Sequence, residues 1–336
     1  MFTKEFMLIK ERYFKKIYQV QQSRVDKTLL NTLAKREPKS LYNPGAYILN
    51  NPGKRLRPML VLFSAKAVKG DYAGSYNAAA AVEILHNFTL VHDDIMDNAD
   101  KRRGLLTVHK KYDVNTAILV GDSLLAVAYE LLLKDLHSNA KEIISTFNNC
   151  VIRVCEGQSL DKEFELRSNV TIAGYIDMIT KKTAAMTEMS CKIGAQIAGG
   201  SKAEIKGLGN FGKYLGIAFQ IQDDLLDIMG DEGDFGKIIG GDLIEGKKTF
   251  IFIHALKKAR GQNKKNLQKV IKNKGIKAYQ IPKYRKIYED LGVLELAQAE
   301  IERYSKLAIN SLNVICNQNE KEVLKMLVNS LLKRAK

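Results

Sequence analysis

Apolar residues recur at helical spacing over long parts of this chain. Residues 76–97, YNAAAAVEILHNFTLVHDDIMD, are apolar at intervals of three and four positions and contain neither Gly nor Pro, which predicts one long helix. Residues 211–229, FGKYLGIAFQIQDDLLDIM, are also apolar at helical spacing. Because apolar positions run most of the way around, we expect both helices to be buried in a bundle. Each of them ends in carboxylates.

The same spacing predicts further helices between and after these two. Glycine-rich or charged connections separate them, at residues 101–104, 199–201 and 230–246. With 336 residues, 46% hydrophobic content and only 5 prolines, the chain is long enough to bury one large core and has few helix breakers. We predict an all-α fold, a single-domain helical bundle over residues 1–336. Its other helices are expected at residues 115–133, 141–163, 171–198, 248–258, 289–311 and 320–334.

Cysteine usage and hydropathy indicate a reducing, aqueous location. The four cysteines form no Cys-x-x-Cys pair, which supports neither a disulfide framework nor a zinc site, so we expect reduced, buried thiols. The N-terminus mixes charges into every apolar stretch and lacks a leader-type cleavage site. No run reaches the roughly 20 apolar residues of a membrane span. We therefore expect a cytoplasmic protein with no transmembrane segment.

The chain carries a formal net charge of +16, and most of the excess lies in one stretch. From Gly246 to Tyr288 there are 14 Lys or Arg residues and no Asp or Glu. This stretch has little aromatic interleaving and no recognisable nucleic-acid module, so a solvated basic face is the better interpretation. We expect no nucleic-acid partner. Contact with an acidic membrane surface, or attraction of polyanionic substrates, stays open.

Two Asp-Asp-x-x-Asp triplets carry the chemistry. Asp93 and Asp97 face the same way because residues i and i+4 lie on one side of a helix, and Asp223 and Asp227 repeat that spacing. Such carboxylates destabilise a helix unless a cation neutralises them, and hard oxygen ligands suit magnesium. A lone triplet is about as well explained by a solvated helix end. Two triplets, each after a long apolar run, favour buried carboxylates that hold metal ions around a diphosphate.

Basic residues lie where a polyanion would need them. The segment GKRLRP places Lys54, Arg55 and Arg57 within one expected helical turn, and Arg102 and Arg103 directly follow the first triplet. Any one of these is more often a plain surface charge, but together they supply charge for two diphosphates, with Arg suited to bidentate contacts. Further candidates are Lys182 beside Thr183, Lys237 in a glycine-rich turn, and Lys247.

An ordered series of motifs from about Gly53 to Phe250 resembles the head-to-tail trans-prenyl diphosphate synthases, the farnesyl and geranylgeranyl diphosphate synthase family. The series contains GKRLRP, LHNFTLVHDDIMD, RRG, GD, EGQ, KKTA, FQIQDDLLD, FGK and GGDLIEGKKT. The resemblance implies an isoprenoid-synthase bundle with a central active-site cavity, three magnesium ions per site and a homodimer. It implies the substrates isopentenyl diphosphate and an allylic diphosphate, joined to give a short-chain prenyl diphosphate.

The resemblance also implies roles for individual residues. Asp93, Asp97, Asp223 and Asp227 would hold magnesium. Isopentenyl diphosphate would be bound by Lys54, Arg57, His86 and Arg103, although a histidine on an apolar helix face is often only a core residue. The allylic diphosphate would be bound by Arg102, Lys182, Lys237 and Lys247. Thr183 and Gln220 would steady the carbocation.

Phe88 and Thr89 are the candidate determinants of product length. Phe88 precedes Asp93 by five positions, about 7.5 Å along a helix, where it could form a floor under the growing chain. In the family an aromatic residue here resembles short-chain enzymes, so a fifteen- or twenty-carbon product is implied. Ordinary core packing is the alternative for Phe88.

Other functions remain to be weighed against this interpretation. A longer-chain polyprenyl diphosphate synthase would share every motif. Class I terpene cyclases share the first acidic motif but lack the GKRLRP segment, and non-catalytic synthase subunits usually lose an acidic motif that is kept here. A nucleic-acid-binding protein would explain the charge alone.

Overall fold

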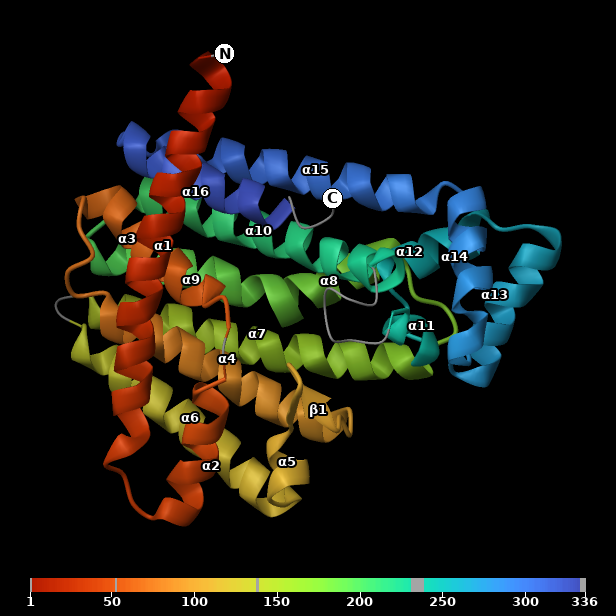
Figure 1. Cartoon of the computed structure of the whole chain (residues 1–336), viewed down its shortest axis with the longest axis horizontal. Coiled ribbons are helices and arrows are strands. Elements are labelled where there is room, and N and C mark those ends of the chain that lie inside the picture. The colour runs from red at the N-terminus through yellow and green to blue at the C-terminus, as the bar shows by residue number, and fades with distance from the viewer. Residues whose placement is uncertain (1, 52, 137–138, 231–238, 333–336) are drawn as a thin grey trace. The chain divides into compact units, whose positions relative to one another are not determined.

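The computed structural model describes residues 2–51, 53–136, 139–230 and 239–332, and helices make up nearly all of its regular structure (Figure 1). This confirms the predicted all-α fold class. Within those ranges the only sheet is a two-residue antiparallel hairpin of β1 (Lys101–Arg102) and β2 (Leu105–Leu106).

The helices follow one another with short connections. In chain order they are α1 (Phe2–Ala34), α2 (Lys39–Leu49), α3 (Leu56–Lys69), α4 (Tyr76–Met96), α5 (Val108–Lys111), α6 (Val114–Lys134), α7 (Ala140–Leu166), α8 (Ile172–Ile179), η1 (Thr180–Ala184), α9 (Ala185–Ile197), α10 (Lys202–Met229), α11 (Gly241–Ile244), α12 (Phe250–Lys258), α13 (Gly261–Asn273), η2 (Ala278–Gln280), α14 (Ile281–Asp290), α15 (Val293–Ser311), η3 (Leu312–Val314) and α16 (Gln318–Leu332).

The chain divides into two compact units. The first consists of Met1–Phe147, Met189–Gly209 and Asn313–Met326, and the second consists of Asn148–Glu188, Asn210–Leu312 and Leu327–Lys336. The boundaries fall inside α7, α9, α10, η3 and α16. The division neither confirms nor contradicts the expected single domain, which stays a prediction.

In the first unit, α4 is the central helix and packs against α6, α3 and α1. Its residues Ala78, Ala79, Ala80 and Ala81 are fully buried, because small side chains let neighbouring helices approach closely. The N-terminus of α4 is capped from a distance, since the Asp135 carboxylate accepts the Ala78 N–H at 2.8 Å. A carboxylate is favourable there because it meets the positive end of the helix dipole.

The second unit has a separate apolar core, built from α8, α10, α12, α14 and α15. Phe252 and Tyr288 are among its largest fully buried side chains, and Ile221 and Ala255 have no exposed surface. Helices from distant parts of the chain therefore fix α10, which carries the second aspartate triplet.

The predicted helix positions hold with local differences. Residues 171–198 are not one helix, because the π-helix η1 lies between α8 and α9. The stretch 289–311 is interrupted at Gly292, which has a φ of 60° that favours glycine. Helix α10 begins at Lys202, nine positions before the expected Phe211. The prediction started too late because polar residues in the first two turns of α10 weaken the apolar pattern there.

The structure bears on the expected absence of a transmembrane segment and on the expected burial of the cysteines. Helix α6 is 21 residues long with a mean hydropathy of 1.7, so by length and composition alone it could cross a membrane. A buried core helix passes the same test, so the expected absence of a transmembrane segment stays a prediction. No disulfide joins the four cysteines, all of which the structure describes, and Cys155 and Cys316 are exposed rather than buried.

The basic stretch is partly a solvated face, as the sequence indicated. On α13, Lys265, Lys269 and Lys272 are exposed and lie on one side of the helix because they recur at intervals of four and three. Lys286 on α14 pairs with Asp290 at 2.9 Å.

Candidate active site

The first aspartate triplet lies at the C-terminal end of α4. The helix ends at Met96, Asp97 is its C-cap, and the Asp97 N–H donates to the Asp93 carbonyl at 2.8 Å. The next residue, Asn98, has a φ of 48°, the left-handed conformation that commonly ends a helix. Asp93 is half-buried and Asp97 is exposed, and one turn separates them on the same side of α4.

The middle aspartate of this triplet has a different role. Asp94 is 1% exposed, and its Oδ1 accepts from Nε of Arg102 at 2.6 Å. Burial raises the pKa of Asp94, and the Arg102 charge opposes that rise. Asp94 lies about 100° around the helix from Asp93, where its side chain enters the packing. The expectation that all three carboxylates gather around metal ions stays a prediction.

The hairpin after α4 places the side chains of the two arginines that follow the triplet, Arg102 and Arg103. Arg103 and Gly104 form its two-residue turn, with φ values of 54° and 80°. Left-handed conformations at both positions are typical of the tight turn that matches strand twist, and Gly tolerates them best. The turn keeps Arg102 beside Asp94 and sends Arg103 to Gly53, where a Cβ atom would lie 2.8 Å from Nη1 of Arg103.

The GKRLRP segment is not one helical turn, which corrects the sequence expectation. Arg55 has a φ of 48° and is the N-cap of α3, which begins only at Leu56. Its side chain is 5% exposed and lies inside the first unit. Lys54, in contrast, is exposed. The three cations therefore separate into a buried structural arginine, Arg55, and two candidate ligands of a diphosphate, Lys54 and Arg57.

His86, on α4, lies between arginines rather than in a plain apolar setting. Nη1 of Arg57 is 3.3 Å from Nε2 of His86, and because arginine only donates, Nε2 accepts. Desolvation, followed by the charges of Arg57 and Arg103, lowers the pKa of His86 well below its usual value of 6.5. The first unit thus places Arg57 and Arg103 near the neutral imidazole of His86. An anion-binding cluster needs positive groups gathered in this way.

In the second unit, Lys182 and Thr183 lie in the π-helix η1. Two glycines on neighbouring helices leave room for this π-helix. A Cβ at Gly157 of α7 would lie 2.2 Å from the Lys182 backbone N, and a Cβ at Gly216 of α10 would lie 2.6 Å from the Ala184 Cα. Since real Cβ atoms do not approach backbone so closely, both positions require glycine, and the widened turn is held between two helices.

Side chains of η1 are tied to α7 and α10. Nζ of Lys182 donates to Asp161 at 2.5 Å. The Thr183 hydroxyl donates to Oε1 of Gln220 at 2.8 Å, and Nε2 of Gln220 donates to Oδ1 of Asp224 at 3.1 Å. The amide of Gln220 is therefore fixed in one orientation, with its oxygen toward Thr183.

Asp224, the middle residue of the second triplet, is buried like Asp94. Its Oδ2 accepts from the Tyr175 hydroxyl and, at 3.3 Å, from the Phe250 N–H. Burial, with a smaller contribution from the Asp242 charge, raises the pKa of Asp224 to about 8. The two triplets share one arrangement: the middle carboxylate is buried and bonded to a neighbouring element, and the two outer carboxylates are less buried.

The outer residues of the second triplet differ from each other. Asp223 is exposed. Asp227 is half-buried, and its Oδ2 accepts the Asp242 N–H at 3.1 Å, which attaches the short helix α11 to α10. Lys247 lies 2.7 Å from Glu245 and 3.6 Å from Asp242, and these charges raise its pKa against the opposing effect of burial. Lys237 lies outside the described residues.

A small hollow in the second unit adjoins this triplet. Asp224, Asp227, Asp242, Lys247 and Tyr288 are among its lining residues. The Tyr288 hydroxyl is buried and has no hydrogen-bond partner among the described residues. Acidic and basic groups thus converge on one side of α10.

The donor set fits a hard divalent cation, although it does not form a complete protein cage. No three His, Cys, Asp or Glu side chains of the described residues are gathered closely enough to hold a metal ion. Asp93 with Asp97, and Asp223 with Asp227, are instead pairs of carboxylates one helical turn apart. Such open pairs suit magnesium, which keeps several waters and is bound through one or two carboxylates together with phosphate oxygens.

Sequence reasoning missed several residues that the structure brings to these positions. Asp161 follows the EGQ motif at a fixed short distance, and Asp242 lies within GGDLIEG, so both had a signal in the motif series. Tyr175 had none, because it lies 49 positions from Asp224. The facing of the two triplets, which belong to different units, stays a prediction.

Comparisons with known proteins agree with these motifs. The sequence profile of the polyprenyl synthetase family matches residues 38–291. A short chain isoprenyl diphosphate synthase of Methanocaldococcus jannaschii is 44% identical over 254 residues, which are 75% of this chain and 77% of that protein.

Solved structures extend the likeness to nearly the whole chain. The geranylgeranyl pyrophosphate synthetase of Pyrococcus horikoshii gives a TM-score of 0.88 at 34% identity, covering 96% of this chain and 99% of that one. The polyprenyl synthase of Caulobacter crescentus, crystallised with calcium and isoprenyl diphosphate, gives a TM-score of 0.88 at 25% identity, covering 96% and 97%. The predicted isoprenoid-synthase type of fold is thereby confirmed.

Proposed function

Because the chain belongs to the polyprenyl synthetase family and is a short-chain prenyltransferase, we propose that it works with magnesium on isopentenyl diphosphate and an allylic diphosphate. The allylic substrate ionises, the double bond of isopentenyl diphosphate attacks the carbocation, and proton loss completes head-to-tail elongation. The observation that carries the proposal is the pair of aspartate triplets, each with its outer carboxylates one turn apart and its middle carboxylate buried.

Asp93, Asp97 and Asp223 are the proposed metal ligands, with Asp227 also facing that side of α10. We propose three ions per active site. When bound, magnesium supplies positive charge that stabilises the departing diphosphate. The calcium found with isoprenyl diphosphate in the C. crescentus structure supports a divalent cation at such a site. The buried contacts of Asp94 with Arg102 and of Asp224 with Tyr175 support a positioning role for these two carboxylates at the helix ends.

The cluster of Lys54, Arg57, His86 and Arg103 would bind isopentenyl diphosphate. Arginine offers paired N–H groups that match phosphate oxygens, and lysine adds a compact charge. The neutral imidazole of His86 accepts from Arg57, which orients that guanidinium. Arg103 reaches the same segment beside Gly53. This substrate is non-allylic, so the cluster needs only to hold its diphosphate in place.

The allylic diphosphate would be bound by Arg102, Lys182, Lys237 and Lys247, which would draw charge from the leaving group. Thr183 on η1 and Gln220 on α10 would each contribute a side-chain oxygen, and oxygen dipoles favour a nearby carbocation. Their hydrogen bond at 2.8 Å fixes both groups before substrate arrives, so little reorganisation is needed during the reaction.

A product assay tests the proposal. The purified chain is incubated with isopentenyl diphosphate, magnesium and dimethylallyl, geranyl or farnesyl diphosphate, and the dephosphorylated alcohols are separated by chromatography. Elongated alcohols that require both diphosphates and disappear with a chelator are expected. Cyclic hydrocarbons formed without isopentenyl diphosphate would instead indicate a terpene cyclase.

Phe88 is the proposed floor of the product cavity. It is half-buried on α4, and its ring meets the His92 ring edge-on at 4.8 Å between centroids. The His92 ring packs closely against Gly121, where a Cβ would lie 2.2 Å from Nε2 of His92. Thr89 donates its hydroxyl to the His86 carbonyl at 2.8 Å. The aromatic pair therefore has a fixed position, which suits a steric stop for a fifteen- or twenty-carbon chain.

Replacement of Phe88 by Ala should lengthen the main product by one or more five-carbon units, because it removes that stop. The same chromatographic assay measures the change. Tyr279→Ala is the control, since it also removes an aromatic ring but from a side chain that is 78% exposed and lies outside α4. An unchanged product distribution in Phe88→Ala would assign Phe88 to core packing alone.

We propose a cytoplasmic homodimer that uses the exposed apolar face of α6. Ile118 is 42% exposed and Leu119 is 60% exposed, although α6 also carries Asp122 and Glu130 with side chains 65% and 48% exposed. Charged groups midway along the helix are costly in a membrane centre, whereas a protein interface accommodates them at its rim.

Leu119→Glu is expected to shift the chain from dimer to monomer, because it places a charge in the proposed apolar contact. Light scattering coupled to size-exclusion chromatography measures the mass. Leu166→Glu is the control, since Leu166 is 80% exposed on α7 and lies outside this face. Retention of the dimer in Leu119→Glu would place the interface elsewhere.

A further inference from the structure

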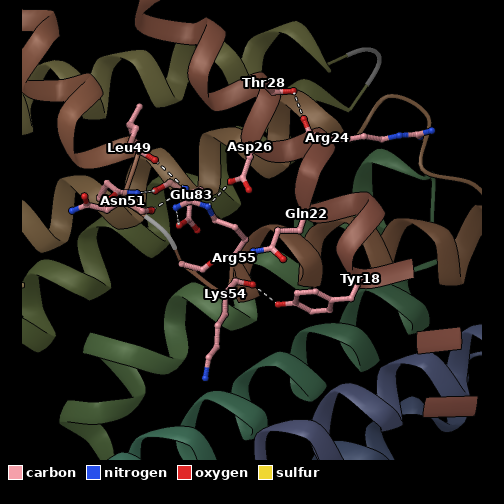
Figure 2. A network of polar contacts seen from close by, with 12 residues as sticks. Tyr18, Gln22, Arg24, Asp26, Thr28, Leu49, Asn51, Lys54, Arg55 and Glu83 are labelled. Carbon is pink, nitrogen blue, oxygen red and sulfur yellow. Dashed lines mark hydrogen bonds and ion pairs between the residues drawn. The ribbon is translucent and has the colours of Figure 1, made fainter. Parts of the chain in front are cut away.

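Helix α1 touches the GKRLRP segment with three side chains from one of its faces (Figure 2). The Tyr18 hydroxyl donates to the Lys54 carbonyl, and Nε2 of Gln22 donates to the Gly53 carbonyl at 2.8 Å. Asp26 accepts from Nε of Arg55 at 2.8 Å. Because the three residues are four positions apart, they lie in a row along α1, and the row meets three consecutive residues.

Arg55 makes the segment rigid at the point where α3 begins. Its left-handed φ of 48° is unfavourable for a non-glycine residue, by about 1–2 kcal/mol. The buried guanidinium offsets that cost with four partners: Asp26, Glu83, the Leu49 carbonyl and the Asn51 carbonyl, all within 3.1 Å. One of the four, Asp26, comes from α1.

The contacts from α1 act on the backbone that carries the candidate ligands. Figure 2 shows the Lys54 side chain directed away from the network, while the Lys54 carbonyl is bonded to Tyr18. The ring of Tyr18 is itself held, with its centroid 6.1 Å from that of Phe63 in α3. These α1 residues precede residue 38, where the match to the family profile begins.

We propose that α1 is a clamp, formed by Tyr18, Gln22 and Asp26, that positions Lys54 and Arg57 for the diphosphate of isopentenyl diphosphate. The proposal rests on the proposed function. Its residues are positioning residues, because they touch the segment and not the substrate. A displaced backbone moves the lysine charge and the arginine donors together, and small misplacements of such groups cost a large part of their effect. Pre-organisation also lowers the entropy that binding must otherwise remove.

The test is a double variant, Tyr18→Phe with Gln22→Met, which deletes both donors but keeps the ring, the side-chain length and the helix propensity. Isopentenyl diphosphate with magnesium is titrated into the protein by calorimetry, and KM is measured for each substrate. We expect a Kd and KM for isopentenyl diphosphate about tenfold higher, equivalent to about 1.4 kcal/mol, with the KM of the allylic substrate unchanged. Tyr18→Phe alone, which removes one hydroxyl donor and keeps the ring, serves if the double variant folds poorly.

Arg24→Ala is the matched control, because Nη1 of Arg24 donates to the Tyr76 hydroxyl at 3.0 Å and ties the same helix to α4 without touching the segment. It should leave the Kd for isopentenyl diphosphate unchanged. If the wild-type chain neither binds nor elongates, the proposed function fails. If the wild-type chain is active and the clamp variants bind isopentenyl diphosphate normally, or lose both substrates equally, the clamp proposal is overturned.

Discussion

Asp93→Ala and Asp223→Ala are each expected to lower kcat about a thousandfold or more while the protein stays folded. Each change removes an outer carboxylate from a proposed metal pair. Deletion of a pre-organised electrostatic group typically lowers kcat by a factor of this size, because the transition state loses charge stabilisation. Since Asp223 is exposed and Asp93 half-buried, truncation removes little packing from the core. The chromatographic assay gives kcat, and circular dichroism confirms the helical fold.

Asp100→Ala is the control for this experiment. Asp100 follows the first triplet closely, its side chain is 78% exposed, and it pairs with Lys110 at 3.0 Å. A surface ion pair of that kind contributes little, so activity should stay near that of the wild type. If Asp93→Ala kept full activity at saturating magnesium, the assignment of the first triplet to metal binding would be wrong.

Gly157→Ala is expected to destabilise the protein by about 2 kcal/mol and to lower kcat about a hundredfold. The new methyl group would meet the Lys182 backbone N at 2.2 Å and the Lys182 Cα at 2.7 Å. Backbone atoms cannot turn aside as a flexible side chain does, so either α7 or η1 must shift, and overpacking of this kind costs about 1–3 kcal/mol. Displacement of Lys182 and Thr183 by about 1 Å would account for the loss in kcat.

Gly174→Ala is the matched control for this substitution. A Cβ at Gly174 would lie 3.3 Å from Oγ1 of Thr171 and 3.6 Å from Phe164, which small side-chain adjustments can accommodate. The helix should gain slightly, because Ala is favoured over Gly in a helix. Thermal melting and kcat are measured for both variants. Wild-type values in Gly157→Ala would show that η1 does not depend on the close approach of α7 at Gly157.

The amino-acid sequence by itself determined the helices and the direction of the outer aspartates. Apolar spacing depends only on neighbours three and four positions away, so α4, α6, α7 and α12 could be placed nearly to their ends. The i and i+4 relation of Asp93 and Asp97 follows from helix geometry alone. Local pattern was enough for these features because each is confined to a few turns of one helix.

Only the tertiary structure decided which charged groups are structural. Asp94 and Asp224 are buried because their side of each helix faces neighbouring elements, and their partners Arg102 and Tyr175 reach them by a hairpin turn and by a helix 49 positions away. Arg55 carries the same formal charge as Arg57, yet it is enclosed by α1 and α4. Long-range packing sets burial, and burial separates a charge that holds the fold from one that can meet a substrate.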